Sequence, residues 1–87
     1  SDGDREKAVR ENREHTAQAD PRAKTVKLAD LIDNLTGIAK IAPSFAEIYL
    51  PEKELQLQVL TEGHPELFEQ VEQIIRTEKA LLGEGNP

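Results

Sequence analysis

The chain has 87 residues, of which 37% are hydrophobic and 32% charged, and its net charge at pH 7 is -6. Its length allows one small domain or part of a larger one, and its acidic balance argues against nucleic acid or an anionic membrane surface as partner. It has no cysteine for disulfides or zinc sites and no stretch that predicts a membrane span or signal peptide, so we expect a cytoplasmic protein.

Residues 1–20 are almost entirely polar and mix charges of both signs at helical spacing, with Glu6 four residues before Arg10. Their apolar residues form only a thin stripe: Ala8, Val9 and Ala17. This pattern predicts a solvated helix or a frayed N-terminal segment. His15 lies in it as a surface residue.

A helix start follows at Asp20, which can cap, and Pro21, which suits the first helical position. Apolar residues then recur at intervals of three and four: Leu28, Leu31, Ile32, Leu35, Ile38, Ala39 and Ala42. This pattern predicts a central helix that ends at Pro43. Gly37 inside the pattern predicts close packing or a bend.

The next stretch, "SFAE" from Ser44 to Glu47, fits a capping box and predicts a helix that runs to Gly63. Pro51 lies inside this pattern and should kink the helix or split it in two.

The last helix is expected to begin after His64 and Pro65, with His64 as a helix-start residue, and to stop at Gly83 before a loose tail, 84–87. No strand alternation or repeat appears. The sequence therefore predicts an all-α protein, a small bundle of about four helices with its body at residues 21–83.

The central helix carries polar residues within the segment "VKLADLIDNL", residues 26–35. Lys27, Asp30, Asn34 and Gly37 are three, four and three residues apart and share one face, and Asp33 lies next to it. A carboxylate can ligate a divalent metal, and an amide one turn later can contact a ligand beside it. The alternative is an ordinary solvent-facing stripe.

The two histidines form no metal-binding constellation with each other, and we assign neither a catalytic role. Lys27 could contact a phosphate or pair with a neighbouring carboxylate. We favour the salt bridge, because exposed helix lysines near acids are common.

"VKLADLIDNL" resembles a late motif of the HD-domain metal-dependent phosphohydrolases, of the form V-K-L-A-D-x-x-x-N-L. It is most similar to that of the guanosine polyphosphate (ppGpp) pyrophosphohydrolases, which include the RelA/SpoT hydrolase domains and small single-domain relatives. The resemblance covers roughly residues 22–75, including the run "FAEIYLPEKELQLQVL". It implies that Asp30 is a ligand of a divalent metal, usually manganese, and that Asn34 contacts the nucleotide.

Two departures from the family pattern matter. The family often has a basic residue after the N-L pair, where this chain has Thr36, which bears on the substrate. The family also requires an upstream His and a His-Asp doublet on earlier helices, and the chain has neither. The chain also has no methionine, so either the initiator was removed before Ser1 or this is an internal or C-terminal piece.

The resemblance therefore implies the C-terminal portion of an HD-type hydrolase for a (p)ppGpp-like nucleotide, inactive alone because metal ligands are missing. In that case the missing helices would cover the apolar side of the central helix, and its exposed Leu and Ile would favour a homodimer. The alternative is a non-catalytic helical interaction or oligomerisation module.

Overall fold

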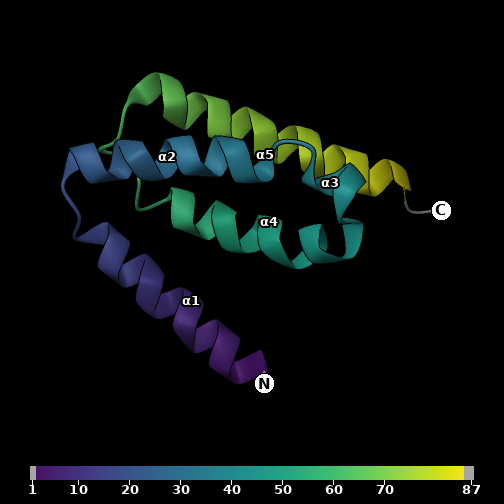
Figure 1. Ribbon diagram of the computed structural model, residues 1–87, viewed down its shortest axis with the longest axis horizontal. Helices are drawn as coiled ribbons and strands as arrows, with labels where there is room; N and C mark the ends of the chain where they lie inside the picture. The colour runs from purple at the N-terminus through teal and green to yellow at the C-terminus, as the bar shows by residue number, and fades with distance from the viewer. Residues whose placement is uncertain (1, 86–87) are drawn as a thin grey trace.

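A computed structural model describes residues 2–85, and these residues form five helices without a strand. The helices are α1 (Asp2–Ala17), α2 (Pro21–Leu35), α3 (Ile38–Ile41), α4 (Pro43–Leu57) and α5 (Pro65–Gly85). Helices α2, α4 and α5 run side by side, and α1 extends from them at an angle and packs on α4 (Figure 1). The prediction of a small all-α bundle is confirmed. None of the helices in residues 2–85 is long and apolar enough to cross a membrane.

Helix α2 begins as its sequence predicts and supplies the centre of the core. The Asp20 carboxylate accepts a hydrogen bond of 2.8 Å from the Ala23 amide, and Pro21 occupies the first turn. The residues at the centre of the core come from α2, α4 and α5 and are almost fully buried: Leu28, Leu31, Leu35, Ala46, Leu50, Val71 and Ile75. The apolar side of α2 is therefore covered by this chain's own helices. The expectation that it would lie exposed is wrong, because α4 and α5 fold back onto it.

The predicted central helix is broken at Gly37, which has a left-handed backbone with φ of 82°. The bend expected there is confirmed, but the helix does not continue to Pro43. A separate short helix, α3, begins after Gly37, and the buried Glu78 carboxylate of α5 accepts a hydrogen bond of 2.9 Å from the Ala39 amide. A side chain from far along the sequence thus satisfies a donor at the start of α3.

Helix α4 differs from its prediction at both ends and in the middle. It begins at Pro43, after Ala42, which caps it without a side-chain hydrogen bond. The capping box predicted at Ser44 is therefore wrong, since Ser44 lies inside the first turn. The helix ends at Leu57, before Gly63, and it runs unbroken through Pro51. Pro51 is exposed, so water can satisfy the carbonyl group that its missing N–H leaves unpaired.

The turn between α4 and α5 is fixed on α2. Gly63 is buried there, and a Cβ atom added to it would lie 2.6 Å from the Leu28 Cδ1. The Thr25 hydroxyl accepts a hydrogen bond of 2.9 Å from the His64 amide. His64 in turn accepts one of 3.2 Å at its Nδ1 from the Glu66 amide, so its helix-start role is confirmed.

Helix α5 starts at Pro65 as expected but continues through the predicted stop at Gly83 to Gly85. The rest of the predicted tail, residues 86–87, lies outside the described residues. The N-terminal segment is a helix, α1, with mostly exposed side chains, including His15.

Candidate functional site

The predicted site residues lie along one flank of α2, beside the stripe that packs into the core. Asp30 and Asn34 are exposed, and neither makes a side-chain hydrogen bond or ion pair within residues 2–85. Lys27 is half-buried and lies on the side of this flank nearer the core. Gly37 does not share the face, because the helix ends before it. Asp33 is exposed and about 60° further round the helix.

These residues do not build a metal centre by themselves. Within residues 2–85, no three side chains of the types His, Cys, Asp or Glu are grouped so that they could hold a metal ion. A catalytic metal commonly needs three protein ligands, and Asp30 would supply one. Asp30 as a ligand therefore remains a prediction that requires partners from other residues.

Lys27 has no carboxylate partner within the described part of the chain, so the salt bridge that we favoured is wrong. It lies between Lys24 and Leu31 on the helix surface, and both of these are buried. Lys24 is the lysine of α2 that forms an ion pair, with its Nζ 2.7 Å from the Glu62 carboxylate. The positive charge of Lys27 instead acts on another lysine, Lys53 of α4, whose pKa it lowers.

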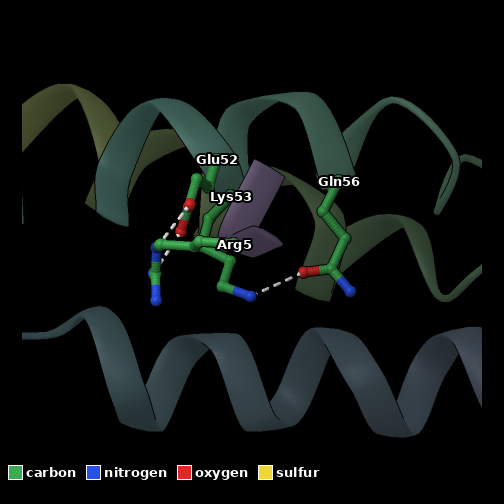
Figure 2. A network of polar contacts seen from close by, with 4 residues as sticks. All are labelled: Arg5, Glu52, Lys53 and Gln56. Atoms are coloured by element: carbon green, nitrogen blue, oxygen red, sulfur yellow. Dashed lines mark hydrogen bonds and ion pairs between the residues drawn. The ribbon is translucent and has the colours of Figure 1, made fainter. Parts of the chain in front are cut away.

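Lys53 and Gln56 reach from α4 toward α2, and sequence reasoning missed both (Figure 2). The Lys53 Nζ donates a hydrogen bond of 3.1 Å to the Gln56 Oε1 and lies 4.8 Å from the centre of the Tyr49 ring. Burial lowers the pKa of Lys53, and the positive charge of Lys27 lowers it further. The signal in the sequence is the spacing of Tyr49, Lys53 and Gln56, which are four and three residues apart and thus share a helix stripe.

Gln56 is a buried amide with one half unsatisfied. Gln56 is 3% exposed, and its Nε2 has no hydrogen-bond partner in residues 2–85. Lysine can only donate, so the Gln56 oxygen must face Lys53, and the NH₂ group must point the other way. A buried amide donor without an acceptor is costly to folding and rare in native proteins.

The nearby carboxylate of Glu52 offsets part of the lowering of the Lys53 pKa, and the charge of Arg5 on α1 opposes this effect. The Arg5 guanidinium donates two hydrogen bonds to Glu52, of 3.0 Å and 2.7 Å (Figure 2). These bonds and the charge of Glu52 raise the pKa of Arg5. Arg5 also lies 5.9 Å from the centre of the Phe45 ring. The bidentate pair thus joins Glu52 of α4 to α1.

Comparison with known proteins adds no identification: no family model, curated protein or solved structure gives a significant match to this chain.

Proposed function

We propose that this chain is the C-terminal part of a cytoplasmic HD-type metal-dependent phosphohydrolase that acts on a (p)ppGpp-like nucleotide. Asp30 is one metal ligand of the complete enzyme, and Asn34 and Lys27 contact the substrate. The observation that supports this best is that Asp30 and Asn34 are exposed one turn apart on a well-packed helix, with both polar groups unengaged within residues 2–85. Groups fixed on a rigid element can recognise a ligand with little loss of conformational entropy.

The proposal also implies that these residues are inactive alone. The donor set around Asp30 is a single carboxylate, so the remaining ligands, a His and a His-Asp doublet, come from helices that precede the motif in the complete enzyme. Those helices would approach the exposed flank of α2 that carries Asp30 and Asn34. The core-facing side of α2 is already occupied and offers them no room.

The test uses the complete open reading frame that encodes this chain, assayed for hydrolysis of a guanosine polyphosphate with manganese. Asp30→Asn should lower turnover at least about 100-fold, since removing a metal ligand costs at least as much as removing its supporting partner. Asp33→Asn is the matched control, because it makes the same change on a neighbouring face of the same helix and should leave turnover within about twofold. Equal effects of the two substitutions, or an open reading frame without the upstream His and His-Asp doublet, would contradict the proposal.

A second candidate function, a non-catalytic interaction or oligomerisation module, is favoured by exposed apolar residues on α3 and α4. Ile41 is 82% exposed and Ile48 56%, and Phe45 and Leu55 continue the same stripe along α4. Helix α1 contacts this stripe through the Arg5–Glu52 pair and the Arg5–Phe45 contact. These contacts leave the apolar side chains of the stripe largely exposed.

This alternative predicts that the chain self-associates through α3 and α4. Sedimentation velocity over a range of concentrations would detect the association, and Ile48→Ser should weaken it. Val26→Ser is the control, since Val26 is similarly exposed, at 59%, but lies on α2. A single monomeric species at all concentrations would exclude a self-association module.

A further inference from the structure

Helix α1 leaves the bundle at an angle, and a groove of about 340 Å³ lies between it and α4 (Figure 1). Val9 of α1 and Pro51 and Leu55 of α4 form its apolar lining. Leu55 is 47% exposed, and none of the side chains of residues 3–17 is buried. Helix α1 therefore lies against α4 without closing the groove, and the apolar lining remains in contact with water.

The apolar lining continues along α4 beyond the groove. Ile48 precedes Leu55 by seven residues, or about 10.5 Å along the helix axis, so the two side chains lie on the same stripe. Ile48 is 56% exposed. A groove bordered by such a stripe fits the apolar face of an amphipathic helix, whose own apolar residues recur every three or four positions.

The α1 side of the groove carries two arginines without a partner. Arg10 is exposed and Arg13 half-buried, and neither forms a hydrogen bond or ion pair within residues 2–85. Of the two carboxylates in the lining, Glu52 is engaged by Arg5, which leaves Glu6. The unpaired charges along the groove are therefore two positive and one negative, on a chain whose net charge is -6.

We propose that the groove between α1 and α4 binds an acidic amphipathic helix of a partner protein. The apolar residues of that helix pack on Val9 and Leu55, and its carboxylates accept hydrogen bonds from Arg10 and Arg13. Because the two arginines are three residues apart on α1, carboxylates one turn apart on the partner helix can pair with both. A fatty acid brings only one carboxylate and would leave one guanidinium group unpaired.

Charge also argues against a second copy of this chain in the groove. A two-fold symmetric dimer brings the same surface of both copies together. Arg10 and Arg13 of one copy would then approach the same arginines of the other, with Glu6 as the unpaired carboxylate of each lining. The inference does not depend on the proposed hydrolase function, because Asp30 and Asn34 lie on α2, outside the groove.

The test is a titration of the ¹⁵N-labelled chain with a designed helical peptide, followed through the backbone amide signals of Val9 and Leu55. The peptide carries leucines two turns apart, with glutamates one turn apart beside them, and a matched peptide has lysines in place of the glutamates. We expect a saturable shift with the acidic peptide and about tenfold weaker binding of the lysine peptide. The net charge of the chain favours the lysine peptide, so the expected preference reports the local charge of the groove.

Two substitutions locate the binding in the groove. Leu55→Ser and Arg13→Gln should each weaken binding of the acidic peptide about tenfold, because the first removes an apolar contact and the second a charged hydrogen bond. The matched controls, Leu81→Ser and Arg76→Gln, lie on α5, where Leu81 is similarly exposed, at 45%, and Arg76 is exposed. Both controls should leave the affinity within about twofold.

Several results would overturn the inference. They are no saturable shift at Val9 and Leu55, equal or tighter binding of the lysine peptide, the same shift with laurate, or equal weakening by Arg76→Gln and Arg13→Gln. Sedimentation velocity tests the remaining occupant. If the chain self-associates and both Leu55→Ser and Arg13→Gln abolish the association, a second copy occupies the groove and the inference is wrong.

Discussion

Lys24 and Lys27 lie about one turn apart on α2, and their surroundings differ in kind. Lys24 is 3% exposed, and its ammonium group is 2.7 Å from the Glu62 carboxylate, in the turn that fixes α5 onto α2. Lys27 has no carboxylate partner within residues 2–85, and its charge lowers the pKa of a second lysine, Lys53. Lys24 therefore stabilises the fold through its ion pair, whereas Lys27 does not. The contrast shows that position on one helix does not decide whether a lysine stabilises the fold, because the partner comes from a distant segment.

The largest expected effect on stability comes from removing a side chain on the core-facing side of α2. Leu31 is 1% exposed at the centre of the core, so Leu31→Ala should lower the free energy of unfolding by about 3 kcal/mol through lost burial and a residual cavity. Urea denaturation followed by circular dichroism measures it. Ile41→Ala is the control, since Ile41 is 82% exposed, and it should change stability by less than about 0.5 kcal/mol. Similar losses from both substitutions would mean that α2 does not occupy the core.

The next largest effect on stability is expected at the turn between α4 and α5, which lies close against α2. Gly63→Ala would place its Cβ 2.6 Å from the Leu28 Cδ1 and 3.2 Å from the Leu60 carbonyl oxygen, so we expect a loss of about 2 kcal/mol. At Gly83 in α5 a Cβ would meet nothing within 4 Å. Gly83→Ala should therefore stabilise the chain by about 0.5–1 kcal/mol through helix propensity. Thermal unfolding measures both, and the same sign for the two substitutions would count against the described turn.

The two lysines themselves provide a direct pair of substitutions. Lys24→Gln removes the ion pair with Glu62 and should cost about 1 kcal/mol, a value moderated by the exposure of Glu62. Lys27→Gln removes only repulsion with Lys53, so stability should stay the same or rise by up to about 0.5 kcal/mol. If Lys27→Gln destabilises as much as Lys24→Gln in urea denaturation, Lys27 has a structural partner and the comparison fails.

A smaller effect follows from the ionisation of Lys53. Its pKa in the folded chain lies below the ordinary value of 10.5, so between these two values the unfolded chain binds more protons and stability rises with pH. The free-energy cost of holding Lys53 charged in the folded chain is fully present at pH values below its pKa in that state. Lys53→Gln removes it, and the variant should exceed the wild type by about 0.5 kcal/mol at neutral pH, a small gain because Lys53 is partly exposed.

This gain should disappear as pH rises through the folded pKa of Lys53 and past about 10.5. Burial raises the pKa of Tyr49, but Tyr49 is present in both proteins, so its titration largely cancels in the difference. Urea denaturation of both proteins at a series of pH values measures the difference. A gain that is constant with pH would show that the charge of Lys53 is not its source.

Local patterns predicted much of the fold but not the features that depend on distant partners. Apolar periodicity and the Asp20–Pro21 start were enough to predict where α2 begins and which of its leucines are buried, but not that Lys24 is buried. Gly37 was enough to predict a bend after α2, but the bond from the Ala39 amide to the Glu78 carboxylate of α5 at the start of α3 has no local signal in the sequence. Helix α4 continues through the exposed Pro51, where helix propensity predicted a kink or a split into two helices.

Local patterns likewise predicted some residues of the candidate site and missed others. Helical spacing predicted that Lys27, Asp30 and Asn34 share a flank of α2. The sequence could not reveal that the charge of Lys27 acts on Lys53, because that effect depends on how α4 packs against α2. The buried position of Gln56 is equally hidden, since a glutamine near the end of an amphipathic helix is usually solvated.

The most direct test replaces Gln56 by leucine and compares the free energy of unfolding of the variant with that of the wild type in urea denaturation. Gln56→Leu should raise the free energy of unfolding by about 1 kcal/mol, because it removes a buried NH₂ group that has no acceptor within residues 2–85. A loss of stability in Gln56→Leu would contradict the described position of this amide.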